Sequence, residues 1–259
     1  MFQKARDILL AKTGIQIEFT PAKTIDEIIK KLKSGEADFA ALESPDYVRA
    51  VEGGVKAVPV VHLAINGKET ANVCLYQLKN SKGTQDIAAL KGKRVSMTGM
   101  WDWIYLQNYL KENKIDKRVK DYFSAISISK NMESSLYELI FGKTDVIVAT
   151  DSSFTMASRA DKRFKDIVRS ECMGEYPNGP TVVNPGVDKK DVQKLLKVFM
   201  GAHKDKDFKD FKIYFVAANA RFIPVNADFY KPFFERVQAA RKAGWISDFE
   251  KFSRQQAQK

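Results

Sequence analysis

The chain of 259 residues contains only two cysteines and two histidines. Cys74 and Cys172 lie 98 positions apart, outside any CxxC spacing, and His62 and His203 fit no metal-ligand or catalytic pattern. We therefore predict no metal site, no cofactor and no Cys/His catalytic pair. Taken alone, the two cysteines leave a single disulfide and two buried thiols equally open.

Long hydrophobic runs are also absent, and none approaches the roughly 20 apolar residues of a membrane helix. The longest apolar runs, such as Val55–Ile65 and Asp145–Thr150, have the length of buried strands. No secretory signal follows Met1, where an amphipathic pattern begins at once. An exported protein of this sequence would have lost its signal, and a cytoplasmic location stays open at this point.

Acidic residues are fewer than basic ones, 32 against 43, which gives a net charge of +11. The basic residues are scattered on expected helices beside acids, as in Glu27–Lys33 and Asp188–Lys197. They form no basic stripe with interleaved aromatic residues, so we predict no nucleic-acid partner. The excess charge is a general bias toward anions, on a surface that is mostly solvated.

Segments with helical spacing of apolar residues alternate with short apolar runs, which predicts mainly parallel sheets with helices on both faces. Thr24 and Glu27 form a capping-box pattern, and Ser44 and Pro45 are typical of a helix start. The expected strands are Ile15–Phe19, Ala37–Leu42, Val73–Leu78, Lys93–Ser96, Ile126–Ile128, Asp145–Ala149 and Ile167–Cys172. The expected helices include Phe2–Thr13, Gly99–Lys111, Met132–Phe141, Ala157–Phe164, Lys189–Ala202 and Phe229–Ala243.

Ligands of such sheets bind beyond the carboxyl ends of strands, where helices begin. Two strand-to-helix loops there combine hydroxyl groups with unpaired backbone N–H groups and a positive helix end, which favours an anion. A glycine would let the backbone approach the ligand, and two aromatic rings would wall it. These candidate ligand-binding residues are Ser44, Tyr47, Ser96, Thr98, Gly99 and Trp101.

Two further strand-to-helix turns carry polar side chains that could bind a hydroxyl or an amine. One begins at Asn131, and the other contains Thr150 and Asp151. Helix capping alone explains the polar residues of all these loops, and a single loop of this kind is more often structural than functional. Only their recurrence after several strands favours a binding site.

Several segments resemble one known family, the PhnD-like phosphate- and phosphonate-binding proteins of ABC transporters. They are Ile25–Tyr47 (IDEIIKKLKSGEADFAALESPDY), Leu90–Gly99 (LKGKRVSMTG), Phe141–Val146 (FGKTDV) and Pro185–Leu196. The resemblance departs from the family at Met97, where a hydroxyl residue is typical, and at Asn131–Glu133, where a histidine is often found.

The resemblance implies the two-lobed α/β fold of type II periplasmic binding proteins, joined at a hinge of two crossing strands. The first lobe would comprise Met1–Val73 and Pro180–Lys259, and the second Cys74–Gly179. Both cysteines would lie on or near the crossing strands.

The implied function is capture of a small anionic ligand, such as a phosphonate, phosphate or related oxyanion, outside the cytoplasm. The lobes would close on the ligand, and a monomeric protein would deliver it to an ABC permease. A membrane sensor is the alternative partner, with the chain as the extracellular domain of a receptor or kinase. The second alternative is an enzyme on the same fold, in which Asp151 or Glu133 would act as an acid or base.

Overall fold

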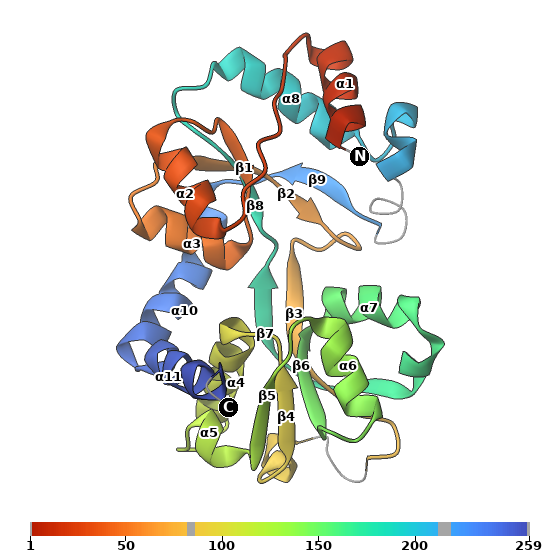
Figure 1. Ribbon diagram of the computed structural model, residues 1–259, viewed down its shortest axis with the longest axis vertical. Coiled ribbons are helices and arrows are strands. Elements are labelled where there is room, and N and C mark those ends of the chain that lie inside the picture. The colour runs from red at the N-terminus through yellow and green to blue at the C-terminus, as the bar shows by residue number, and fades with distance from the viewer. Residues whose placement is uncertain (1, 82–85, 212–218, 258–259) are drawn as a thin grey trace. The chain divides into compact units, whose positions relative to one another are not determined.

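The computed structural model describes residues 2–81, 86–211 and 219–257 (Figure 1). The described chain forms two compact units. Unit 1 comprises residues 1–70 and 177–234, and unit 2 comprises 71–176 and 235–259. The chain therefore passes between the units three times, twice in strands and once within helix α10 (Lys231–Lys242).

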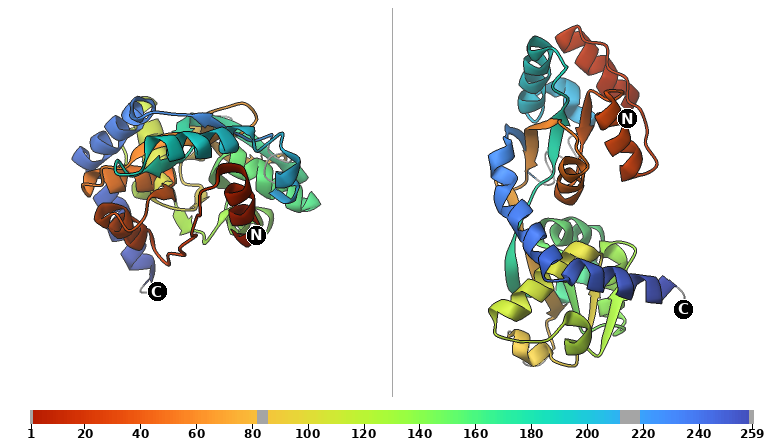
Figure 2. Two further views of the ribbon diagram at one scale, coloured as in Figure 1. Left: turned by 90° about the horizontal axis from the view of Figure 1, so that it is seen from above. Right: turned by 90° about the vertical axis from the view of Figure 1, so that its left-hand side faces the viewer.

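The division differs from the predicted one in the last 25 residues, which were expected in the first lobe. In the structure, α11 (Trp245–Ala257) packs on α4 (Met100–Glu112) of unit 2 (Figure 2). The ring of Trp103 lies 5.8 Å from that of Phe249 and 5.4 Å from that of Phe252. Sequence spacing could not reveal this aromatic contact, because its partners are more than 140 positions apart.

Unit 1 contains a four-stranded sheet in the order β1-β8-β2-β9. All its neighbouring strands are antiparallel, and β8, which returns from unit 2, lies between β1 and β2. The prediction of mainly parallel sheets is therefore wrong for this unit. Its strands are β1 (Phe39–Ala41), β2 (Val58–Ala64), β8 (Pro180–Val183) and β9 (Arg221–Pro224). Its helices are α1 (Phe2–Thr13), α2 (Ile25–Ser34), α3 (Ser44–Glu52), α8 (Lys189–Gly201), η3 (Lys206–Phe211) and η4 (Ala227–Tyr230).

Local signals set the bounds of several helices in unit 1. The Thr24 side chain accepts a hydrogen bond from the Glu27 N–H at the start of α2, and Gly35 ends the helix in a left-handed conformation. The predicted strand Ile15–Phe19 does not form. Ile15 and Ile17 pack instead in a hydrophobic cluster around Leu9, which accounts for their alternation without a strand partner.

Unit 2 contains a five-stranded sheet in the order β5-β4-β6-β3-β7. Strand β4 pairs in parallel with β5 and with β6, whereas β3 runs antiparallel to β6, so this sheet is mixed. Its strands are β3 (Thr70–Leu78), β4 (Arg94–Met97), β5 (Ala125–Ile128), β6 (Val146–Thr150) and β7 (Ile167–Pro177). Its other elements, besides α4 and α11, are η1 (Ile87–Leu90), α5 (Val119–Tyr122), α6 (Met132–Ile140), α7 (Asp151–Ala160) and η2 (Lys162–Asp166).

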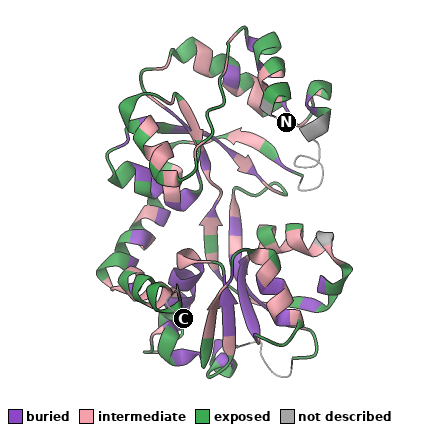
Figure 3. Ribbon diagram, viewed as in Figure 1, coloured by how far each residue is buried: buried purple, intermediate pink, exposed green. Residues whose placement is uncertain are grey.

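The core of unit 2 lies on both faces of this sheet, and Figure 3 shows buried positions concentrated in β3, β4 and β6. Ile147 and Ala149 of β6 face the cluster with Leu136 and Leu139 of α6. The alternate residues of β6 point to the opposite face, where α4 contacts the strand. A disulfide joins Cys74 of β3 to Cys172 of β7, which resolves the two alternatives that the sequence left open.

No helix within the described ranges is both long enough and apolar enough to span a membrane.

Candidate functional site

The three parallel strands of unit 2 end side by side at one edge of the sheet. Ser96 of β4 is paired with Ser127 of β5 and with Ile147 of β6, so β4 and β5 end level and β6 runs two residues further. Neighbouring strands lie about 4.8 Å apart, so the three strands are about 10 Å across at this edge. Helices α4, α6 and α7 begin just after these ends, and their first N–H groups have no partner within the helix.

The start of α4 is closed by a carboxylate of its own first turn. Gly99 is the N-cap residue, and its side chain offers no cap. Asp102, 9% exposed, accepts hydrogen bonds from the backbone N–H and the hydroxyl of Thr98, each over 2.8 Å. Burial raises the pKa of Asp102 to about 6, although these bonds and one from the Gly99 N–H oppose the shift.

Helices α6 and α7 are capped by the side chains predicted to line a site. The exposed Asn131 accepts a hydrogen bond from the Ser134 N–H at 2.9 Å. Thr150 accepts one from the Ser153 N–H at 3.2 Å. Each cap satisfies one N–H of the first turn and leaves the preceding ones directed out of the helix end.

Asp151 is held by the neighbouring strand. Its two carboxylate oxygens accept hydrogen bonds from the backbone N–H and the side-chain amide of Asn72, at 3.1 and 3.0 Å. Because β3 is antiparallel to β6, its amino end brings Asn72 to the same edge. Asp151 therefore has a pairing partner within unit 2 besides any role toward a ligand.

Ser96 lies below the edge rather than on it. Its side chain is fully buried, and its hydroxyl lies 2.9 Å from that of Ser129 and 3.2 Å from that of Ser135. These three buried hydroxyl groups join the ends of β4 and β5 to the first turn of α6. We infer that Ser96 supports the position of the α6 start.

The two aromatic side chains expected to wall a ligand pack into hydrophobic clusters. Trp101, partly buried, belongs to a cluster with Ala240 and Trp245 in unit 2. Tyr47 is 4% exposed in unit 1, and its ring lies edge-on to those of Tyr230 and Phe234 at 5.1 and 5.7 Å. Both rings therefore contribute to packing in this structure.

The start of α3 in unit 1 differs from the expected helix start. Glu43, not Ser44, is the N-cap residue, and Ser44 is fully buried and donates its hydroxyl to the Pro177 carbonyl at 2.7 Å. Desolvation raises the pKa of Glu43, helped by the charge of Asp46. Desolvation likewise raises the pKa of Asp46. Two carboxylates therefore lie at this helix start, as first-turn carboxylates do at the helix starts of unit 2.

The loop before α3 passes close to Gly179. A Cβ atom added to Gly179 would lie 2.1 Å from the Leu42 carbonyl oxygen and 2.8 Å from Glu43 Cα, so only glycine fits beside the loop.

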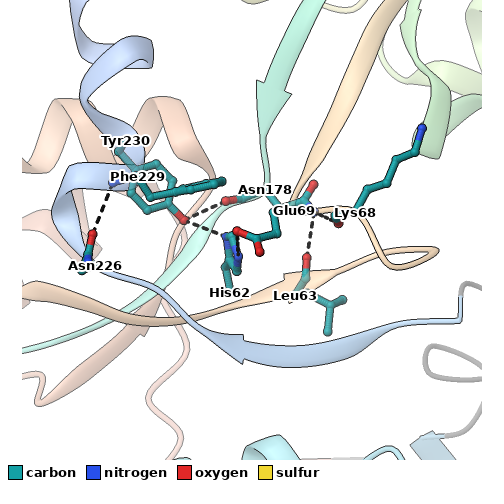
Figure 4. Close-up of polar contacts among 8 residues, drawn as sticks. All are labelled: His62, Leu63, Lys68, Glu69, Asn178, Asn226, Phe229 and Tyr230. Atoms are coloured by element: carbon teal, nitrogen blue, oxygen red, sulfur yellow. Dashed lines mark hydrogen bonds and ion pairs between the residues drawn. The ribbon is translucent and has the colours of Figure 1, made fainter.

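Unit 1 also contains a buried polar network around His62 of β2 (Figure 4). The imidazole Nδ1 lies 3.3 Å from the hydroxyl of Tyr230, which donates to the Asn178 carbonyl at 2.8 Å. The Nε2 atom lies 3.6 Å from a Glu69 oxygen, beyond a normal hydrogen bond. Burial lowers the pKa of His62, against the attraction of Glu69.

Sequence reasoning missed Asp102 and Asn72. Asp102 follows the N-cap residue Gly99 by three positions, which is the spacing of a capping box. This spacing would have predicted that the Asp102 carboxylate binds N–H groups at the helix start. Asn72 gave no local signal, because its partner Asp151 lies 79 positions away.

The edge of unit 2 therefore presents three positive helix ends. Neutral donors come from the first turns of α6 and α7, and from the α4 start beyond the Thr98 and Gly99 N–H groups that Asp102 accepts. Each end carries about half an elementary charge, which is a known arrangement for binding phosphate-like anions. Three first-turn carboxylates oppose this charge: those of Asp102, Glu133 and Asp151. The arrangement suits a small oxyanion held by hydrogen bonds better than a highly charged anion.

Solved structures share this fold across nearly the whole chain. XAC2383 from Xanthomonas citri, bound to chloride ion, is 14% identical, with a TM-score of 0.71 over 93% of this chain and 92% of its own. PhnD1 from Prochlorococcus marinus, in complex with methylphosphonate, is 15% identical, with a TM-score of 0.69 over 94% and 92%. The aliphatic sulphonate binding protein SsuA from Escherichia coli is 12% identical, with a TM-score of 0.65 over 93% and 82%. These likenesses confirm the type II periplasmic binding protein fold that the family resemblance implied.

Among curated proteins, none matches this chain. A sequence-family model does match, over residues 1–230, and describes a periplasmic substrate-binding protein of a phosphonate ABC transporter. The match covers most of both units, including the starts of α4, α6 and α7. The chain therefore belongs to the family of periplasmic substrate-binding proteins of phosphonate ABC transporters.

Proposed function

We propose that this chain captures a small tetrahedral oxyanion of the phosphonate class at the carboxyl edge of the unit 2 sheet. The observation that carries the proposal is the convergence of three helix starts on three adjacent strand ends. The methylphosphonate and sulphonate named for two structural neighbours are also small tetrahedral oxyanions. Asn131, Thr150 and Asp102 would hold the helix starts in position, and the N–H groups of the first turns would contact the ligand oxygens.

The proposal includes binding without turnover, by a monomer outside the cytoplasm that delivers the ligand to a membrane permease. Family membership supports the permease and the location. The described side chains at the edge are occupied in capping and pairing, which supports binding rather than catalysis. Incubation with methylphosphonate followed by ³¹P NMR checks this part, since any new phosphorus signal would indicate turnover.

A proline scan of the first helical position tests the site. Proline is tolerated there and removes one N–H group without breaking the helix. Met132→Pro removes the first N–H of α6, and we expect methylphosphonate binding to weaken about 10- to 100-fold, the usual effect of one hydrogen bond to a charged group. Met132→Ala controls for the lost side chain, and Lys189→Pro controls for proline at the same position of α8 in unit 1.

Isothermal titration measures all four proteins. Both controls should bind like the wild type. If Met132→Pro binds as tightly as Met132→Ala, the α6 start does not contact the ligand, and the proposed site is wrong.

A further inference from the structure

The direction of one hydrogen bond restricts the ligand that the unit 2 edge accepts. Thr98 is exposed at this edge, and its hydroxyl lies 2.8 Å from Asp102 Oδ2. An ionised carboxylate only accepts hydrogen bonds, so the hydroxyl must be the donor. The same oxygen accepts the Thr98 backbone N–H at 2.8 Å, so Thr98 is held through both its backbone nitrogen and its hydroxyl.

A threonine hydroxyl has a single hydrogen and two lone pairs. With the hydrogen committed to Asp102, only lone pairs remain to face a ligand. Thr98 therefore acts as an acceptor at an edge where the first-turn N–H groups act as donors. This reverses the donor role that the sequence suggested for its hydroxyl.

We propose that Thr98, held by Asp102, selects oxyanions that carry their own acidic hydrogen, so that a phosphonate monoanion binds in preference to a sulfonate. This inference rests on the proposed function and specifies its substrate class. A phosphonate monoanion has a P–OH group that can donate to Thr98 while its other oxygens accept from the helix starts. A sulfonate has no such hydrogen near neutral pH, so its oxygen would meet the Thr98 lone pairs.

Asp102 is a positioning residue in this arrangement. Its raised pKa of about 6 still leaves the carboxylate mostly ionised at pH 7, the condition that keeps Thr98 an acceptor. Sites that are built to bind a ligand hydroxyl discriminate strongly against analogues that lack it, because a polar group is then left unpaired. At a partly open edge we expect a smaller preference, of about tenfold or more.

Isothermal titration at pH 7.0 with methylphosphonate and methanesulfonate tests the proposal. The wild type should prefer methylphosphonate by about tenfold or more. Thr98→Val removes the hydroxyl and keeps the shape, and it should reduce the preference to less than about threefold by weakening methylphosphonate alone. Thr98→Ser keeps the hydroxyl and should keep the preference.

A variant of Asp102, the hydrogen-bond partner of Thr98, tests the same proposal. Asp102→Ala frees the Thr98 hydroxyl to donate, so the ratio of the two affinities should fall toward one. Thermal melts establish that each variant is folded before its titration is interpreted.

The outcomes separate this inference from the proposed function. If Thr98→Val weakens both probes equally, or neither, the edge binds an oxyanion but Thr98 is no acceptor for its hydrogen, and the inference is overturned alone. If the wild type binds neither probe, the proposed function fails and this inference fails with it. A preserved preference in Asp102→Ala would also contradict the role given to Asp102.

Discussion

Thr98 donates its backbone N–H and its hydroxyl to the same carboxylate oxygen of Asp102, each over 2.8 Å. The helix start of α4 is thereby closed by a buried negative charge that belongs to the protein itself. This pairing makes the Thr98 hydroxyl a hydrogen-bond acceptor toward a ligand. The raised pKa of Asp102 also makes the unfolding free energy depend on pH.

Replacing Asp102 with asparagine should flatten the pH dependence of the unfolding free energy. Burial raises the pKa of Asp102 from 3.8 to about 6, so the folded state binds the proton more tightly than the unfolded state. The destabilisation by this carboxylate is fully present above pH 6 and is relieved as the pH falls toward 4. As the pH falls over that range, the unfolding free energy of the wild type should rise relative to that of the variant by at most about 3 kcal/mol.

Urea unfolding at pH 8, 6 and 4.5 measures this difference. Asp151→Asn is the matched control, because it removes another first-turn carboxylate of the same edge. A pH-independent difference for Asp102→Asn would contradict the burial of an ionised carboxylate at this position.

His62 should contribute in the opposite direction. Burial lowers its pKa below the ordinary 6.5, so the unfolded state takes up a proton first as the pH falls. Stability is lost as the pH falls from 6.5 toward the folded pKa, and His62→Phe should lack this loss. His203→Phe is the control, and unfolding at pH 7.5 and 5.5 distinguishes the two variants. Equal pH slopes in wild type and His62→Phe would contradict the prediction.

Gly179→Ala should be strongly destabilising, by several kcal/mol, because its Cβ would lie 2.1 Å from the Leu42 carbonyl and the loop before α3 must move. Gly186→Ala is the matched control, since its Cβ would meet nothing within 4 Å. Thermal unfolding compares the two. Similar melting temperatures for both variants would show that the loop does not lie against Gly179.

Reduction of the disulfide between Cys74 and Cys172 should cost about 2–5 kcal/mol of unfolding free energy, because it releases a loop of 98 positions in the unfolded chain. The double variant Cys74→Ala, Cys172→Ala should show the lower stability with or without reductant. Urea unfolding with and without reductant provides the comparison. A wild type whose stability does not respond to reductant would contradict a disulfide in the native protein.

Capping residues and apolar periodicity are local signals, so they predicted most strands and helices and the strand-to-helix loops of unit 2. The two-lobed fold was implied by the family resemblance. The local signals did not predict the strand directions in unit 1, since β8 reaches its place between β1 and β2 only after the chain has built most of unit 2. The burial of Tyr47 and Ser44 was not predicted for a similar reason. Their burial depends on Tyr230 and Pro177, which are distant in sequence.

The most direct test of the central claim is a titration of the ¹⁵N-labelled protein with methylphosphonate, followed by amide NMR. The largest shifts at saturation should fall on the first-turn amides of α4, α6 and α7, at residues 100–101, 132–133 and 151–152. Unit 2 also has a cavity of about 710 Å³ lined by basic residues, among them Lys111, Lys117 and Arg118, and by Asp116 and Asp121. Shifts confined to that cavity, or no shifts at all, would contradict an oxyanion site at the edge of the unit 2 sheet.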